Sequence, residues 1–116
     1  MSDCIFCRIA DGSIPSEIVY QDDDVVAFRD IHPVAPVHLL IVPRKHVANL
    51  LDLATDPDGS RVAEAVLRAV PRVAAAAGVD RTGFRLINNC GEDGGQTIGH
   101  VHFHLIGGRS LGEKLL

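Results

Sequence analysis

The chain has 116 residues, which is the size of one ordinary domain and leaves no room for two. Apolar residues make up 47% of it and charged residues 22%, as in a globular protein with a hydrophobic core. The net charge of −4 argues against a general nucleic-acid binder, because phosphate contacts need a basic face, but a small anionic ligand needs only a few local donors.

The N-terminal half of the chain predicts three strands. Residues 17–20 and 25–28 are short apolar runs on either side of a polar, acidic turn, and together they predict a β-hairpin. Pro33 and Pro36 mark a loop after the hairpin. The apolar run 38–43 then predicts a buried third strand.

The C-terminal half predicts one long helix and two further strands. Apolar residues recur at helical spacing over residues 60–77, and Gly78 is a suitable stop. Pro71 lies inside this helix and should kink it or remove a hydrogen bond. Residues 84–88 and 101–106 predict the remaining strands. Short turns between strands, with one long helix, indicate an α+β fold with a mainly antiparallel sheet.

Three histidines alternate along the last predicted strand. Side chains of His100, His102 and His104 should share one face, because alternate residues of a strand point the same way. Burying three imidazoles on one face is costly without partners, so an ordinary polar sheet face explains them poorly. Two interpretations remain: histidines spaced by one residue can ligate a metal, and a neutral imidazole can attack phosphorus.

The preceding segment, residues 88–97, favours the phosphate interpretation. It offers amide, hydroxyl and backbone N–H donors, which suit phosphate oxygens. A hard-cation site would need more carboxylates than the pair at Glu92 and Asp93. Four glycines fall between Gly91 and Gly99, and at such positions backbone can approach a ligand closely.

The sequence from 94 to 109, Gly-Gly-Gln-Thr-Ile-Gly-His-Val-His-Phe-His-Leu-Ile-Gly-Gly-Arg, resembles the signature of the histidine-triad (HIT) nucleotide-binding family. Its ending is similar to the Hint branch, and weaker matches cover residues 5–15, 28–31 and 38–46. The resemblance implies a HIT-like α+β fold, with a mainly antiparallel five-stranded sheet, one long helix and one short helix. Residues 1–116 would then form a single HIT domain.

The resemblance also implies a reaction. The chain would hydrolyse a purine nucleoside monophosphate conjugate, such as AMP linked to an amine, at its α-phosphate, as a nucleoside phosphoramidase does. His102 would be the nucleophile and would form a nucleotidyl-histidine intermediate that water hydrolyses; an imidazole of ordinary pKa, about 6.5, is largely neutral at pH 7. His104 would donate to the phosphate, and Thr97 or His104 would pass a proton to the leaving amine. The implied catalytic residues are His38, Thr97, His100, His102 and His104.

A nucleotide site follows from the same match. Asp30 corresponds to the ribose-binding acid of the family, although on its own it could be a turn acid at a strand end. Gln96 and Thr97 match the positions at the bridging atom and α-phosphate, and Gly95 lies in the same loop. Asn89 matches an asparagine near the phosphate, although Asn88 beside it could be confused with it. Taken singly, the residues of the implied purine slot would be ordinary core: Phe6, Ile9, Ile14, Phe28 and Ile31.

The spacing of Cys4 and Cys7 alone could mean a redox motif, half of a metal site, or two small packed side chains. HIT proteins with this pair resemble a subgroup with a structural Cys2His2 zinc, which would map to Cys4, Cys7, His46 and His100. The alternative is a reduced, metal-free pair. No organic cofactor is implied.

Partners and location are the last expectations. The resemblance implies a homodimer paired through the long helix and a sheet edge. No apolar run reaches the roughly 18 residues of a membrane span, the start of the chain lacks signal-peptide character, and three cysteines do not suit a disulfide framework. We therefore expect a cytoplasmic protein that binds neither membrane nor nucleic acid.

Other functions remain as alternatives. A dinucleoside polyphosphate hydrolase is disfavoured by the ending Gly107-Gly108-Arg109, because that branch carries a different block after the triad. A non-catalytic nucleotide sensor or interaction protein would share the pocket, and a true metalloenzyme would use the histidines as ligands. Residues 110–116 lack the tail typical of Hint proteins, so the preferred leaving group stays open.

Overall fold

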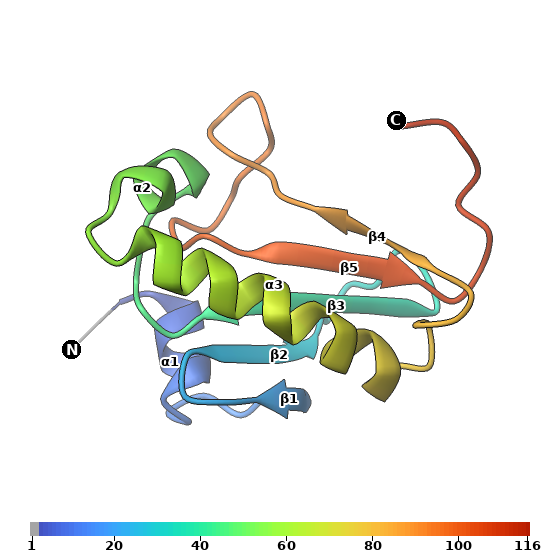
Figure 1. The fold of residues 1–116 in the computed structure, drawn as a ribbon, viewed down its shortest axis with the longest axis horizontal. Helices are drawn as coiled ribbons and strands as arrows, with labels where there is room; N and C mark the ends of the chain where they lie inside the picture. Colours follow the sequence, from blue (N-terminus) through green and yellow to red (C-terminus); the bar gives the residue numbers. More distant parts are fainter. Residues whose placement is uncertain (1–2) are drawn as a thin grey trace.

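In the computed structural model, which describes residues 3–116, one five-stranded sheet is covered by helices on both faces (Figure 1). All neighbouring strands are antiparallel, in the order β1-β2-β3-β5-β4, which confirms the predicted α+β fold. Residues 1–2, part of the signal-peptide argument, lie outside the described residues. The elements in chain order are α1 (Ile5–Ala10), β1 (Ile18–Gln21), β2 (Val25–Arg29), β3 (Val37–Pro43), α2 (Leu50–Thr55), α3 (Gly59–Ala76), β4 (Phe84–Ile87) and β5 (Phe103–Gly107).

Strands β2 and β3 are buried on both faces, and their residues alternate between two cores. The core beneath α3 contains their odd-numbered residues Val25, Ala27, Leu39 and Ile41. The core against α1 contains their even-numbered residues Val26, Phe28, Leu40 and Val42. Because both faces are covered, these strands appear in the sequence as unbroken apolar runs rather than as alternating patterns.

The long helix α3 matches its predicted span to within one residue at each end. It runs through Pro71, which lies on the exposed side of the helix, as does Leu67. Pro71 has no N–H to donate to the carbonyl of Leu67. Because this carbonyl lies on the water-facing side of the helix, water can replace the missing donor. Gly78 ends the helix with φ of +75°, and the N–H of Val79 then donates to the carbonyl of Ala74 at 3.0 Å.

Two short helices are present, although only one was expected. In α1 the sulfur of Cys4 accepts the N–H of Cys7 at 3.4 Å. In α2 the side chain of Asn49 accepts the N–H of Asp52 at 2.9 Å. None of the helices in the described part of the chain has both the length and the apolar character needed to cross a membrane.

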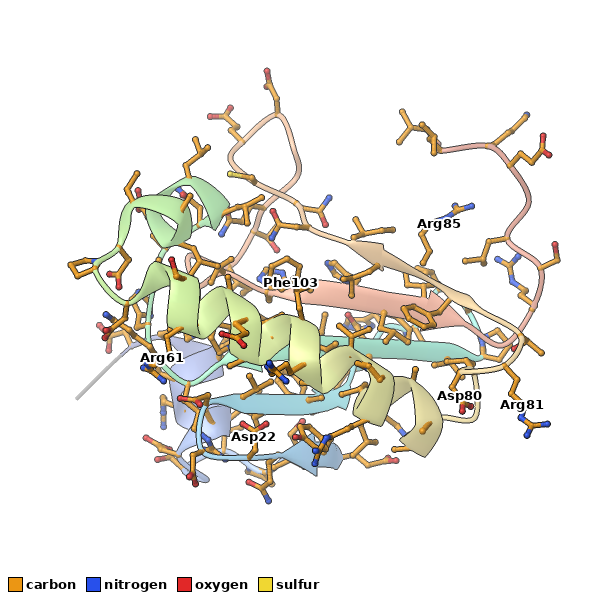
Figure 2. The ribbon with its side chains drawn as sticks, viewed as in Figure 1. Asp22, Arg61, Asp80, Arg81, Arg85 and Phe103 are labelled. Carbon is orange, nitrogen blue, oxygen red and sulfur yellow. The ribbon has the colours of Figure 1, made fainter. Side chains whose placement is uncertain are left out.

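Strand β5 begins at Phe103, two residues later than predicted, so only His104 of the three alternating histidines lies inside a strand. The N–H of Val101 donates at 2.7 Å to the carbonyl of Val47, which lies in the segment before α2. At Val101 the chain is therefore hydrogen-bonded to that segment and not to β3. The alternation of faces nevertheless persists. Val101 and Phe103 pack on the side of α3 (Figure 2), and His102 lies against Phe6 of α1 on the other side.

Candidate active site and metal centre

The histidines singled out by the sequence divide into two neighbouring clusters. The cysteine cluster consists of Cys4, Cys7, His46 and His100. The imidazole cluster consists of Asp30, His38, His102 and His104. Both draw on the segment from His100 to His104, and one residue, Val101, separates His100 of the first cluster from His102 of the second.

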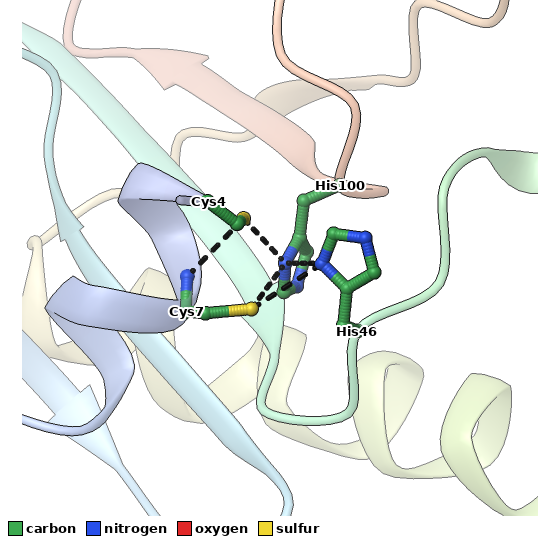
Figure 3. Close-up of side chains that lie close together, drawn as sticks. All are labelled: Cys4, Cys7, His46 and His100. Atoms are coloured by element: carbon green, nitrogen blue, oxygen red, sulfur yellow. Dashed lines mark hydrogen bonds between the residues drawn. The ribbon is translucent and has the colours of Figure 1, made fainter. Parts of the chain in front are cut away.

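In the cysteine cluster, four donor atoms from three parts of the chain converge (Figure 3). The first turn of α1 supplies both sulfurs. The Sγ of Cys4 lies 3.2 Å from Nδ1 of His100, and the Sγ of Cys7 lies 3.3 Å from Nδ1 of His46 and 3.4 Å from Nδ1 of His100. The two Nδ1 atoms are 3.2 Å apart.

The proton on His100 lies on the ring nitrogen that faces away from the cluster. Nε2 of His100 is 2.8 Å from the carbonyl oxygen of Pro43. A carbonyl only accepts, so Nε2 carries the hydrogen and Nδ1 presents its lone pair to the sulfurs. The ring is fully buried, and burial lowers the pKa of His100 below its ordinary value, which favours this neutral form.

These four side chains fit a zinc ion. Thiolate and neutral imidazole are its usual ligands, and tetrahedral bonds of ordinary length hold ligand atoms roughly 3.3–3.8 Å apart. The observed separations of 3.2–3.4 Å are close to this range. The bond from His100 to Pro43 supplies the outer partner that orients a metal-bound histidine.

In the imidazole cluster, His102 keeps its lone pair on Nε2. Its Nδ1 is 2.8 Å from the carbonyl oxygen of His100, so Nδ1 donates and carries the ring proton. The side chain is 6% exposed, and the edge of Phe6 packs against it with ring centroids 4.9 Å apart. A neutral ring in this form has its remaining nitrogen available as a nucleophile.

His38 and His104 form a series of hydrogen bonds with a defined direction. The backbone N–H of Val34 donates to Nδ1 of His38 at 3.1 Å, so the proton of a neutral His38 ring is on Nε2. That Nε2 lies 2.9 Å from Nδ1 of His104 and donates to it, which leaves the proton of His104 on its own Nε2. Burial, followed by the charges of His102 and His38, lowers the pKa of His104, while Asp30 raises it.

Asp30, His38 and His104 also lie close enough to hold a metal, with Oδ2 of Asp30 3.4 Å from Nε2 of His38. The hydrogen bonds argue against this. Because Val34 donates to Nδ1, the Nε2 atom of His38 carries a proton and offers no lone pair to a metal ion. His38 therefore acts as a hydrogen-bond donor to His104 and not as a metal ligand.

The expected purine slot is assembled in part. Phe6, Ile9 and Phe28 are buried together, with Ile14 packed against them, whereas Ile31 is 84% exposed. Beside this slot, Oδ1 of Asp30 accepts the N–H of His32 at 2.8 Å, and the Asp30 side chain is 19% exposed.

The glycine-rich loop is folded by its own amides. Nε2 of Gln96 donates to the carbonyls of Ala48 at 2.7 Å and Ile98 at 2.9 Å, and its Oε1 accepts the N–H of Gly91 at 3.0 Å. Asn89 likewise donates to the carbonyl of Gly94 at 2.8 Å. Gly95 and Thr97 line a hollow of about 580 Å³ beside this loop.

Three groups that orient the histidines escaped the sequence analysis. Two are backbone atoms, the carbonyl of Pro43 and the N–H of Val34, which no residue pattern can mark. The third is the side-chain amide of Asn88, which donates to the carbonyl of His102 at 2.9 Å. Its only sequence signal was a second polar residue beside Asn89.

Comparisons with known proteins extend over nearly the whole chain. A family model described as HIT domain matches residues 11–111. The purine nucleoside phosphoramidase of Escherichia coli strain K12 is 41% identical over 111 residues, which cover 96% of this chain and 92% of that protein. A histidine triad protein from Clostridium difficile has a TM-score of 0.91 at 46% identity, covering 98% and 97% of the two chains. A HIT family hydrolase from Legionella pneumophila Philadelphia 1 has a TM-score of 0.88 at 43% identity, covering 95% and 96%.

Proposed function

The chain belongs to the HIT domain family, and from this premise we propose that it hydrolyses purine nucleoside monophosphate conjugates at the α-phosphate. The preferred substrate is AMP linked to an amine, which makes the protein a nucleoside phosphoramidase. One observation carries the proposal: His102 keeps a lone pair on Nε2 while the neighbouring His104 keeps a proton on Nε2. A nucleophile and a hydrogen-bond donor thus lie side by side, with ring centroids 5.3 Å apart.

The relatives support the same reaction class. The Escherichia coli protein, 41% identical, is named a purine nucleoside phosphoramidase, and the Legionella protein is described as a HIT family hydrolase. Both alignments cover at least 95% of this chain. The HIT family model matches residues 11–111, the range in which the imidazole cluster lies.

The reaction proceeds in two displacements. Nε2 of His102 attacks phosphorus, the bond from phosphorus to the amine breaks, and a nucleotidyl-imidazole forms. The carbonyl of His100 accepts the Nδ1 proton of His102 and so stabilises the positive charge that develops on the ring. The leaving amine takes a proton from Thr97 or His104. Water then attacks phosphorus, the bond from phosphorus to Nε2 breaks, and the proton that the water loses returns to the donor, which releases AMP and the neutral His102 ring.

His104 stabilises charge on the phosphate. The proton of His104 stays on its Nε2 because Nδ1 of the same ring accepts a hydrogen bond from His38. Nε2 of His104 can therefore donate to a phosphate oxygen. A donor placed in this way contributes roughly 100- to 1,000-fold in rate.

Nucleotide binding uses the residues around these rings. The carboxylate of Asp30 would accept from the ribose hydroxyls, and the purine would lie against the slot that contains Phe6 and Phe28 and would cover the exposed Ile31. Thr97 and the loop around Gly95 and Asn89 would approach the phosphate. Gln96 would give up one of its backbone bonds if it contacts the bridging atom.

The cysteine cluster would hold one structural zinc ion through Cys4, Cys7, His46 and His100. When bound, the ion would tie α1 to the segment that carries His102, as a fixed support and not as a Lewis acid. A cytoplasmic location stays a prediction, supported by three cysteines that do not suit a disulfide framework.

A homodimer built from one such domain per chain, residues 1–116, is also part of the proposal. Two features support pairing through the long helix and a sheet edge. Strand β4 is an edge strand on which Phe84 is 37% exposed, and Leu67 on α3 is 63% exposed.

The test is AMP release from adenosine 5′-phosphoramidate by the wild-type chain and by His102→Asn. We expect the substitution to lower turnover by about 1,000-fold or more, because it removes the nucleophile and keeps a polar side chain at this position. AMP should still bind, as isothermal titration calorimetry would show. His32→Asn, the same change at an exposed histidine, is the control and should remain active.

Turnover by His102→Asn would refute the mechanism. Absence of turnover in both chains, with AMP still bound, would instead favour a dinucleoside polyphosphate substrate or a nucleotide sensor.

A further inference from the structure

The proposed nucleophile lies just outside the sheet. Strand β5 begins at Phe103, whose partner in β3 is Ile41, and β4 ends at Ile87, whose partner in β5 is His104. The peptide of His102 thus lies where both ladders stop. Its position depends on other contacts.

The side chain of Asn88, one residue beyond β4, makes such a contact. Its Nδ2 donates to the carbonyl oxygen of His102 at 2.9 Å. The orientation of the amide is determined by that carbonyl, because the opposite orientation would bring two acceptors together. In this orientation the Oδ1 atom of Asn88 is buried and has no hydrogen-bond partner among the described residues.

The unpaired oxygen argues that Asn88 does not serve stability alone. A buried acceptor without a partner is destabilising, and an apolar side chain of similar size would avoid it. What the asparagine provides in return is the bond to the peptide of His102.

A second bond holds the same segment from another part of the chain. The N–H of Val101 donates to the carbonyl of Val47 at 2.7 Å, on the α2 side. The His102 ring is itself bonded through Nδ1 to the carbonyl of His100. Loss of the Asn88 bond would therefore leave the nucleophile attached but less closely held.

We propose that Asn88 is a positioning residue for His102, which holds the peptide so that Nε2 stays in line with phosphorus. The inference rests on the proposed function, in which His102 is the nucleophile. Rates of oriented reactions are sensitive to position, and a displacement of about 1 Å can lower them roughly 100-fold. With one of several restraints removed, we expect a smaller loss of about tenfold.

The experiment compares Asn88→Leu with the wild-type chain, both purified in the presence of zinc. The assay measures kcat and KM for adenosine 5′-phosphoramidate, the Kd for AMP and the melting temperature. We expect kcat to fall about tenfold while KM and Kd change less than about threefold. The melting temperature should stay within a few degrees, because leucine removes the unpaired oxygen together with the donor.

Asn88→Asp is the second variant and keeps the shape of the side chain. Its carboxylate cannot donate and repels the carbonyl of His102, so kcat should fall at least as far as in the leucine variant. It decides the question if Asn88→Leu does not fold. Leu86→Ala, two residues earlier and packed against the core under α3, is the control: it should lower the melting temperature and keep kcat.

An unchanged kcat in the Asn88 variants, with His102→Asn inactive, would overturn this inference and leave the proposed function intact. A loss of kcat of the same size in Leu86→Ala, in proportion to the fall in melting temperature, would also overturn it. Turnover by His102→Asn would refute the proposed function and the positioning role together.

Discussion

The cysteine cluster and the imidazole cluster share the short segment from His100 to His104, and yet the ring nitrogens of their histidines are arranged in opposite ways. In the first, Nε2 of His100 donates its hydrogen to the carbonyl of Pro43, so the lone pair on Nδ1 of His100 points at other ligand atoms. In the second, the N–H of Val34 donates to Nδ1 of His38, and Nε2 of His38 donates in turn to Nδ1 of His104. Donors and acceptors therefore alternate from Val34 to His104. Converging lone pairs suit a metal ion, and alternating protons and lone pairs form a chain of hydrogen bonds. The backbone partners of His100 and His38 therefore set the direction of the hydrogen bonds in the two clusters.

The largest expected effect comes from breaking the cysteine cluster. Removal of zinc by a chelator, or Cys7→Ser, should lower the free energy of unfolding by about 4 kcal/mol, the contribution of a ligand present at 1,000 times its Kd. Urea denaturation with and without chelator measures this loss, and elemental analysis should find one zinc per chain. Turnover should decline only as the protein unfolds.

Cys90 provides the matched control, because it belongs to neither cluster. Cys90→Ser should keep its zinc and its unfolding midpoint. A metal-free wild-type chain that unfolds at the same urea concentration as the metal-loaded one would show that the cluster is only a reduced thiol pair.

A smaller effect is expected from the donor chain. His38→Leu removes the donor to Nδ1 of His104, so the ring proton of His104 is no longer confined to Nε2, and kcat should fall about 10- to 100-fold. His38→Gln offers an amide N–H in place of Nε2 and should recover part of that loss. Steady-state kinetics separate the two variants, and equal activity in both would exclude the donor role. Zinc content should not change in either.

The smallest effect concerns pH. The lowered pKa of His104 means that the unfolded chain, with its ordinary pKa of about 6.5, binds protons before the folded chain does. Stability from this group is complete above about pH 6.5 and is lost as the pH falls through the folded pKa. The stability advantage of wild type over His104→Asn should therefore shrink between about pH 7.5 and about pH 5.5. An advantage that grows over this range in urea titrations would contradict the assignment.

Most of the fold could be predicted because its signals are local. The apolar runs of β2 and β3 and the helical spacing of α3 depend on neighbouring residues only. The one short helix that was expected had no predicted bounds, because six residues carry little periodicity, and the sequence mark of α2 is the cap at Asn49. The start of β5 was misplaced because Val101 bonds to Val47, a partner more than 50 positions away.

The site could be predicted by residue type but not by chemical state. The resemblance marked both clusters, and the structure brings their members together. It could not indicate which nitrogen of each ring carries the proton, because that depends on backbone atoms of distant segments. Nor could it anticipate that Ile31 is exposed, since an apolar residue in a motif does not reveal whether its neighbours or a ligand will cover it.

The order of strands in space also bears on how the protein is made. Strand β5 is the last of the five along the chain, but it lies inside the sheet, between β3 and β4. During synthesis β1 to β4 emerge first, and β4 cannot join the other three strands until β5 is present between β3 and β4. Both histidine clusters need residues 100–104, so neither can assemble until this segment has left the ribosome. Folding must therefore pair β5 with β3, a distant part of the chain, and contacts between distant residues are the kind that form slowly.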